Sequence, residues 1–151
     1  KDNHSRKYFF TKNYDEDDET PMLGNENWDI SNWGIFRAFS EENAVGAMAC
    51  AWDTKNVWRL EDRKDICVLW DLRVHPDYRK QGIGKMLFEK AIDFATDRGC
   101  RCLKVETQNI NVPACKFYQK QGCQIGSFNR YAYWELPDEV LLDWYYFFDG
   151  K

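Results

Sequence analysis

No apolar run in this chain approaches the roughly 20 residues that a helix needs to cross a bilayer, and 30% of its 151 residues are charged. The first seven residues also lack the apolar core of a secretory signal. These absences argue against a membrane-spanning protein, and we expect a cytoplasmic protein without a membrane partner. The chain has no initiator methionine, so we expect further residues upstream of it.

Metal-binding patterns are absent as well. The six cysteines form no C-x-x-C pair, and only two histidines, His4 and His75, are present to complete a site. Several cysteines fall in apolar patterns, where a free thiol behaves as a small hydrophobic group. The sequence therefore predicts no bound metal and six reduced thiols, at Cys50, Cys67, Cys100, Cys102, Cys115 and Cys123.

Basic residues are in deficit, because 21 Lys and Arg face 25 Asp and Glu and give a net charge of −4. Nucleic-acid binders concentrate Lys and Arg, so we expect no nucleic-acid partner. Acidic residues are densest at 15–19, an unbroken run that ends shortly before a proline. We interpret this run as a solvated loop or helix end, with a lip that attracts a cationic ligand as the alternative.

Hydrophobic periodicity divides the chain into short elements. Strands are predicted at 35–40, 45–52, 67–74, 103–107, 123–133 and 140–148, and helices at 84–98 and 112–122. The polar turn at 41–43 predicts a hairpin, and the charged stretch at 53–65 predicts a loop. Strands alternate with helices in the middle of the chain, and an antiparallel pair closes it. We therefore expect one α/β (α+β) domain over 1–151, with a mixed sheet flanked by helices.

Two central strands each have a polar side. In the first, Val68, Trp70, Leu72 and Val74 are predicted to share one face, and Leu69, Asp71 and Arg73 the other. In the second, Leu103, Val105 and Thr107 are predicted to lie opposite Lys104 and Glu106. The sequence thus predicts one carboxylate, Asp71 or Glu106, on the polar side of each central strand.

A basic turn with two glycines precedes the first predicted helix. Its sequence is Tyr78-Arg79-Lys80-Gln81-Gly82-Ile83-Gly84-Lys85. Glycines at a helix start let backbone N–H groups converge on an anion, and the helix dipole and the basic side chains add favourable potential. The spacing fits neither a P-loop nor a Rossmann motif, since Leu87 stands where the third Rossmann glycine belongs. The turn predicts a pyrophosphate site or, alternatively, only a tight connection.

A pair of motifs about 30 residues apart is the most specific pattern in the chain. The first is Arg79-x-x-Gly82-x-Gly84 after Asp71-Leu72-Arg73-Val74-His75-Pro76, and the second is Asn111-x-x-Ala114-x-x-Phe117-Tyr118-x-x-x-Gly122. Together they resemble the acetyl-CoA-binding region of the GCN5-related N-acetyltransferase (GNAT) superfamily. The segments 105–118, 129–133 and 144–146 and the acidic run resemble its streptothricin acetyltransferase branch. The resemblance extends from about residue 8 to residue 148, and the family's opening strand has no counterpart in it.

The resemblance implies a mostly antiparallel sheet flanked by helices and acetyl-CoA as the cosubstrate. The cofactor contacts that it implies are Leu72, Val74, Arg79, Gln81, Gly82, Ile83, Gly84, Lys85 and Asn111. It also implies that Tyr118 protonates the departing thiolate. A phenol has a reference pKa of about 10 and therefore holds its proton at neutral pH. The alternative role of Tyr118 is core packing.

The attacking amine requires a base. A lysine-like amine, with a pKa near 10.4, is almost fully protonated at neutral pH, so a group must remove a proton directly or through water. Asp71 and Glu106 are the candidates, with Asp71 preferred because it directly precedes the segment expected to pair with the cofactor. Either carboxylate could instead orient the substrate or pair with Arg73 or Lys104. His75 is a weaker candidate, since its place before a proline at a strand end suits a surface turn.

The resemblance implies acetyl transfer in a ternary complex, without a metal or a covalent enzyme intermediate, to an amine of a small cationic acceptor. The resemblance favours streptothricin as the acceptor, and acetylation would inactivate this antibiotic. The alternative acceptor is another polyamine or a protein amine. Aromatic rings at Tyr131 and Tyr133 are expected to help to bind the cation. A rival of another class is a CoA-binding interaction module without catalysis, and Tyr118 with two candidate carboxylates argues against it. A homodimer is left open.

Overall fold

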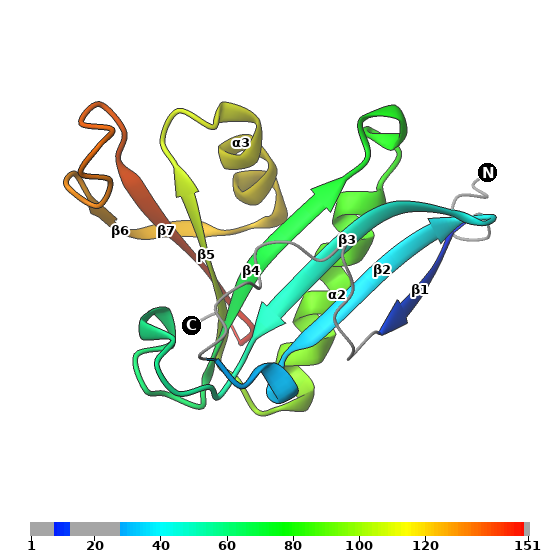
Figure 1. Cartoon of the computed structure of the whole chain (residues 1–151), viewed down its shortest axis with the longest axis horizontal. Helices are drawn as coiled ribbons and strands as arrows, with labels where there is room; N and C mark the ends of the chain where they lie inside the picture. Colours follow the sequence, from blue (N-terminus) through cyan, green and yellow to red (C-terminus); the bar gives the residue numbers. More distant parts are fainter. Residues whose placement is uncertain (1–7, 13–27, 150–151) are drawn as a thin grey trace.

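The strands join into one seven-stranded sheet in the order β1-β2-β3-β4-β5-β7-β6 (Figure 1). The computed structural model describes residues 8–12 and 28–149. The strands are β1 (Tyr8–Lys12), β2 (Gly34–Ser40), β3 (Asn43–Ala51), β4 (Ile66–Val74), β5 (Cys102–Gln108), β6 (Gln124–Asn129) and β7 (Leu141–Phe147). Every neighbouring pair is antiparallel except β4 and β5. The prediction of a mixed, mostly antiparallel sheet with helices is confirmed.

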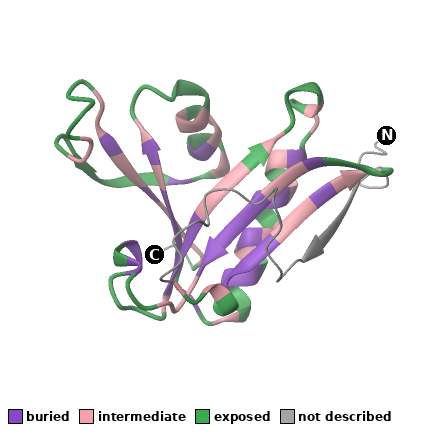
Figure 2. Ribbon diagram, in the orientation of Figure 1, coloured by how far each residue is buried: buried purple, intermediate pink, exposed green. Residues whose placement is uncertain are grey.

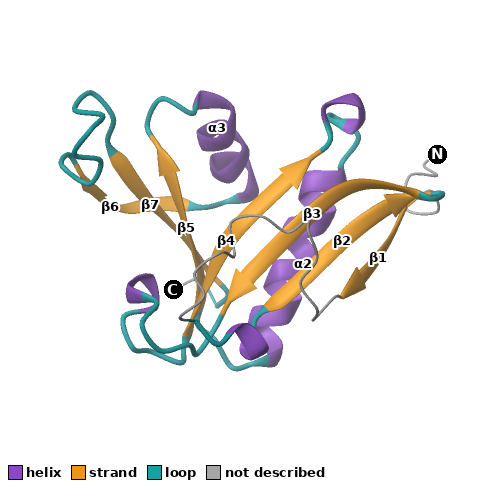
Figure 3. Cartoon of the chain, in the orientation of Figure 1, coloured by secondary structure: helices purple, strands orange, loops and turns teal. Residues whose placement is uncertain are grey.

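The first part of the sheet is a meander of β2, β3 and β4. The predicted hairpin is confirmed, and Glu41 turns the chain with a φ of 58°. The backbone of β1, for which no strand was predicted, pairs with β2 at the edge of the sheet. The stretch predicted as a loop after β3 contains the 3-10 turn η2 (Trp58–Leu60). Two further 3-10 turns, η1 (Ile30–Asn32) and η3 (Pro76–Tyr78), lie next to strands (Figure 3).

Helix α2 (Ile83–Asp97) packs its apolar side on one face of the sheet. The five residues predicted for that side are all buried; they are Leu87, Phe88, Ala91, Phe94 and Ala95. Figure 2 shows buried and exposed stretches alternating along the helix, as expected when one side faces the sheet. Gly99 follows the helix with a φ of 77°, which confirms its predicted place after the C-terminus. None of the described helices is long and apolar enough to cross a membrane.

Strand β4 contains a bulge that the sequence did not predict. Asp71 faces Ala49 and Leu69 faces Cys50, so Trp70 is an extra residue in the ladder. A bulge shifts the alternation of side chains by one position. As a result Leu69 packs in the same cluster as Leu72 and Val74, whereas Val68 and Trp70 belong to the cluster on the other face. The predicted faces of this strand were therefore wrong beyond Trp70.

The end of the chain forms a second antiparallel unit, in which β5, β7 and β6 lie side by side (Figure 1). Helix α3 (Val112–Gln121) begins at the predicted place and ends at Gly122, whose φ is 102°. Its Tyr118 belongs to the same buried cluster as α2. Strand β6 ends at Asn129, four residues before the predicted end, because the segment up to β7 folds as a series of turns.

Candidate active site

A cleft opens where the two central strands separate. Strands β4 and β5 are paired only from Ile66 and Cys102 to Val68 and Lys104, and beyond these pairs they diverge (Figure 1). The space between them is a cleft of about 410 Å³. It is lined by Arg59, Val68, Leu69, Trp70, Asp71, Leu72, Val105, Glu106, Thr107, Gln108, Asn111, Ala114, Tyr118 and Tyr133. The three predicted catalytic residues, Tyr118, Asp71 and Glu106, all lie on this cleft.

Tyr118 lies on α3 at the wall of the cleft, and only 7% of its surface is exposed. Burial raises the pKa of the phenol well above its usual range, with smaller contributions from Cys123 and Asp71. The group therefore keeps its proton throughout the neutral and mildly alkaline range. Its ring also contacts those of Phe88 and Phe117, with centroids 6.2 and 5.1 Å away. Tyr118 is thus both part of the core and a proton-bearing group at the cleft.

Asp71 forms an ion pair on its own strand. The Nε and Nη2 atoms of Arg73 donate hydrogen bonds to its two carboxylate oxygens, at 3.0 and 3.4 Å. The side chain of Arg73 is 48% exposed and that of Asp71 is 21% exposed. Such a partly exposed pair is weak, so Asp71 keeps a carboxylate at the cleft that a ligand can contact.

Glu106 pairs with neither Arg73 nor Lys104, the two partners that the sequence analysis considered for it. Its Oε1 lies 3.1 Å from Nη1 of Arg59, and its Oε2 accepts a hydrogen bond of 2.6 Å from the hydroxyl of Tyr133. Nζ of Lys104 instead donates hydrogen bonds to Oε2 of Glu61, at 2.9 Å, and to the backbone oxygen of Arg59, at 3.1 Å. Glu106 thus has two partners, the buried Arg59 and the hydroxyl of Tyr133, whereas Arg73 is the one cationic partner of Asp71 among the described residues.

Arg59 is a site residue that the sequence analysis missed. It lies in η2, between β3 and β4, and is 4% exposed. Its Nη2 contacts Oδ1 of Asp143 on β7, and Oδ2 of Asp143 accepts a hydrogen bond of 2.9 Å from Ser127. The signal in the sequence was a single arginine within the apolar run Val57-Trp58-Arg59-Leu60, which is an unusual place for an exposed charge.

The glycine turn leaves the start of α2 open to an anion. The first hydrogen bond of the helix runs from N of Met86 to O of Gly82, at 3.0 Å, and no side chain caps this end. The N–H groups of Ile83, Gly84 and Lys85 therefore lie outside the helical ladder. Gly82 adopts a φ of +88°, and apart from its two chain neighbours no described residue has an atom within 4 Å of the position that its Cβ would take. This geometry fits a phosphate group.

Gly84 provides a close approach between the two sequence motifs. A Cβ at this position would lie 3.2 Å from the ring of Phe117 on α3 and 3.8 Å from Val74. The second glycine thus lets α2 pack against the helix that contains Tyr118. Because β4 leads from the cleft to this turn, the two predicted parts of a cofactor site are continuous along one strand.

The remaining predicted cofactor contacts are partly engaged within the protein. Nε of Arg79 donates to the carbonyl of Val74, at 3.1 Å. Lys85 lies 3.4 Å from Glu89. The Oδ1 atom of Asn111 caps α3 by accepting from N of Ala114, at 3.2 Å. Leu72 lines the cleft, and Gln81 lies half-buried in the turn.

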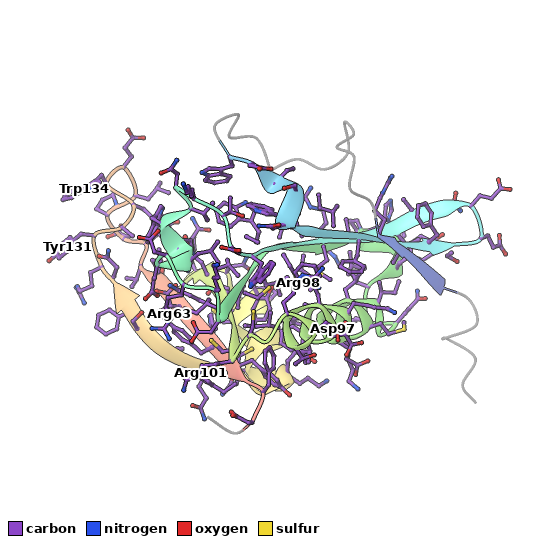
Figure 4. The ribbon with its side chains drawn as sticks, turned by 90° about the horizontal axis from the view of Figure 1, so that it is seen from below. Arg63, Asp97, Arg98, Arg101, Tyr131 and Trp134 are labelled. Carbon is purple, nitrogen blue, oxygen red and sulfur yellow. The ribbon has the colours of Figure 1, made fainter. Side chains whose placement is uncertain are left out.

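The remaining candidate site groups from the sequence analysis lie in different parts of the molecule. His75 is exposed and does not line the described cleft, and its Nδ1 accepts from N of Asp77 at 3.1 Å, as befits a turn. Tyr133 lines the cleft, but Tyr131 and Trp134 are 68% and 83% exposed and stand at the outer edge of the molecule (Figure 4). The acidic run at 15–19 lies outside the described residues.

Comparisons with known proteins agree with this geometry. Residues 3–123 match the profile described as the Acetyltransferase (GNAT) family. Streptothricin acetyltransferase A of Bacillus subtilis (strain 168) is 32% identical over 146 residues, which cover 95% of this chain and 76% of that protein. A ribosomal-protein alanine N-acetyltransferase of Escherichia coli is 33% identical over 69 residues, which cover 46% of this chain and 47% of that protein.

A solved structure extends the similarity to three dimensions. The 1.6 Å crystal structure of a candidate streptothricin acetyltransferase from Bacillus anthracis, in complex with acetyl coenzyme A, matches this fold with a TM-score of 0.68 at 34% identity. The match covers 78% of this chain and 64% of that chain, so the present chain spans just under two thirds of its length. The profile match, the relatives and the fold lead to one conclusion: this chain belongs to the GNAT acetyltransferase family.

Proposed function

We propose that this chain transfers the acetyl group of acetyl-CoA to an amine of a small cationic acceptor, and that the acceptor is streptothricin. The observation that supports it most is the cleft between β4 and β5, where a protonated phenol and a carboxylate face one space. The helix start next to the same strand is open to a phosphate. The similarity to the Bacillus subtilis streptothricin acetyltransferase, over 95% of this chain, supports the choice of acceptor.

Acetyl-CoA would bind along one path. The N–H groups of Ile83, Gly84 and Lys85 would bind the pyrophosphate, and Gly82 keeps the approach to them open. Beyond Val68, β4 has no ladder partner in β5, so its backbone is available to the pantetheine arm. This path delivers the thioester to the part of the cleft between Asp71 and Tyr118.

The chemistry is an acyl transfer in which each proton has a place. Asp71, directly or through a water molecule, takes a proton from the acceptor ammonium. The amine nitrogen then forms a bond to the acetyl carbonyl carbon, and the bond between that carbon and sulfur breaks. Tyr118 gives its proton to the departing sulfur, and the second proton on the nitrogen, which is lost as the amide forms, passes through water to the Tyr118 phenolate. The high pKa of Tyr118 ensures that this proton is present at neutral pH.

The charge of the cleft suits a cationic acceptor. Asp71, Glu106 and Asp143 place three carboxylates on or next to it, against the two guanidinium groups of Arg59 and Arg73. The ring of Tyr133 adds an aromatic face beside Glu106, and an aromatic face attracts a cation by about 0.5–2 kcal/mol. Free, buried cysteines in the described residues are consistent with a reducing compartment, and we propose the cytoplasm.

A protein amine is the second candidate acceptor. It is favoured by the similarity to the ribosomal-protein acetyltransferase, but that similarity covers 46% of this chain, against 95% for the streptothricin enzyme. A binding module without catalysis is disfavoured, because a protonated phenol and a carboxylate share the cleft.

The test is a comparison of acceptors. Release of CoA thiol from acetyl-CoA is measured with streptothricin, spermidine, free lysine and a histone-tail peptide, and mass spectrometry locates the added acetyl group. We expect the highest kcat/KM with streptothricin, and a KM that rises with salt as the screening length shortens from about 10 Å at 0.1 M to about 3 Å at 1 M. If kcat/KM is tenfold higher for the peptide or for spermidine than for streptothricin, a difference of about 1.4 kcal/mol, streptothricin is not the acceptor. No thiol release with any amine would contradict the enzyme itself.

A further inference from the structure

Arg59 has buried hydrogen-bond donors that no described residue accepts. Its Nε has no hydrogen-bond partner among the described residues, and its Nη1 lies 3.1 Å from Oε1 of Glu106 without the geometry of a hydrogen bond. Within the described part of the chain, Nη2 alone has a hydrogen-bond acceptor, which is Asp143. The side chain is 5% exposed and lines the cleft. A buried guanidinium with unfilled donors is rare, because a buried donor without an acceptor costs free energy.

The surrounding contacts fix Arg59 rather than let it move to satisfy these donors. Nζ of Lys104 donates to its backbone oxygen at 3.1 Å, and its guanidinium carbon lies 5.1 Å from the centre of the Trp58 ring. Asp143 forms an ion pair with Nη2 of the guanidinium group. Arg59 thus lines the cleft with a side chain that is held at several points, which is the arrangement of a recognition group.

The charge around Arg59 selects the kind of acceptor atom. Glu106 and Asp143 contribute two negative charges against the one positive charge of Arg59. A ligand carboxylate would add a third negative charge to this group, whereas an amide oxygen accepts hydrogen bonds without adding charge. An amide also brings an N–H group, for which the carboxylate of Glu106 is a suitable acceptor. The best match is therefore a neutral amide.

We propose that Arg59 is a specificity-determining residue, which donates hydrogen bonds to an amide carbonyl of the acceptor while the amine of the same molecule lies between Asp71 and Tyr118. The acceptor is then an amine that bears an amide, and simple polyamines lack the group that Arg59 recognises. This inference rests on the proposed acetyl transfer and narrows its substrate class.

Three compounds of equal chain length test the inference: 6-aminohexanamide, hexylamine and 6-aminohexanoate. Each has one amine, and they differ only in an amide, a methyl group or a carboxylate at the other end. They are measured as competitive inhibitors of acetyl transfer to the best acceptor. We expect the amide to bind at least about tenfold more tightly than either of the others, because an analogue that leaves buried polar groups unpaired is rejected strongly. Equal binding of the amide and hexylamine, or tightest binding of the carboxylate, overturns the inference.

Arg59→Lys keeps the positive charge and removes the planar set of guanidinium donors. We expect it to abolish the preference for the amide while the inhibition constant of hexylamine changes little. The control is Arg63→Lys, since Arg63 lies in the same connection, is 47% exposed and pairs with Asp65 outside the cleft; it should keep the preference. Equal weakening of all three compounds in Arg59→Lys shows a structural role only and overturns the inference.

Two outcomes need a second measurement. If circular dichroism shows that Arg59→Lys does not fold, the ranking of the three compounds on the unmodified protein decides. If no amine is acetylated, the proposed function fails, and calorimetric binding of the same compounds then tests the role of Arg59 by itself.

Discussion

The hydroxyl of Tyr133 donates a hydrogen bond of 2.6 Å to Oε2 of Glu106, and so ties the connection between β6 and β7 to β5. The other oxygen of Glu106 lies 3.1 Å from Arg59. These two contacts, with a buried guanidinium and with a hydroxyl, make Glu106 well placed to orient a substrate. We expect Asp71 to be the base, because its one cationic partner among the described residues, Arg73, is 48% exposed and such a pair is weak.

Isosteric changes separate these two roles. We expect Asp71→Asn to lower kcat by about 10²–10⁴-fold, the usual contribution of a general base, with a small change in the KM of the acceptor. Glu106→Gln should instead raise the KM of the acceptor and largely preserve kcat. Steady-state kinetics with both substrates varied is the measurement. A loss of kcat in Glu106→Gln with normal turnover in Asp71→Asn would reverse the assignment.

Tyr118→Phe removes the proton and keeps the ring. Since general acids contribute about 10²–10⁴-fold, we expect kcat to fall toward that range while the KM of acetyl-CoA stays constant. Tyr146→Phe is the control, because its ring packs against Phe88 at 5.6 Å, as that of Tyr118 does at 6.2 Å, but it does not line the cleft. Full turnover in Tyr118→Phe would leave the tyrosine with a packing role only.

Buried thiols predict a loss of stability at alkaline pH. Burial raises the pKa of Cys100 and of Cys123 to about 12 each, and that of Cys102 to about 11, whereas an unfolded cysteine titrates near 8.5. Above that pH the unfolded chain loses protons that the folded chain retains, so unfolding becomes easier as the pH rises toward the folded values. Below pH 8 the contribution of these thiols is fully present.

The urea midpoint should therefore be lower at pH 10 than at pH 8. Because lysines and tyrosines also titrate in this range, the informative quantity is the difference from a Cys100→Ala, Cys123→Ala double variant. This variant should be less stable than the unmodified protein at pH 8, since it leaves cavities, but its midpoint should fall less between the two pH values. An equal fall in both proteins would show that the thiols do not contribute.

The features that the sequence predicted well are local ones. The apolar side of α2 follows from a spacing of three and four residues, and the ends at Gly99 and Gly122 follow from the left-handed backbone that glycine adopts there. The glycine turn was recognisable for the same reason. Each of these signals is contained in a few consecutive residues.

The features that it did not predict depend on contacts between distant segments. Arg59 meets Asp143 across 84 positions of the chain, and nothing within 53–65 reveals that partner. The bulge at Trp70 is a property of the register between β3 and β4, so periodicity within β4 could not show it. Glu106 was placed on the correct side of β5, but its partners come from η2 and from the connection after β6.

Gly82 and Gly99 lie at opposite ends of α2 and provide a matched pair for the cofactor site. Both have a positive φ, +88° and +77°, and beyond their chain neighbours no described residue has an atom within 4 Å of either Cβ position. Valine at either position must adopt the left-handed region, which costs roughly 1–2 kcal/mol, so both variants should lose similar stability. Only at Gly82 does the new side chain lie beside the free N–H groups at the start of the helix.

We expect Gly82→Val to weaken CoA binding at least tenfold, about 1.4 kcal/mol, and Gly99→Val to bind CoA normally. Calorimetric titration gives the affinities, and urea denaturation confirms that the two variants are destabilised alike and still folded under the assay conditions. Normal CoA binding in folded Gly82→Val would mean that the pyrophosphate does not lie at this turn. An equal loss in both variants would mean that a general destabilisation of α2, rather than a blocked approach, lowers the affinity.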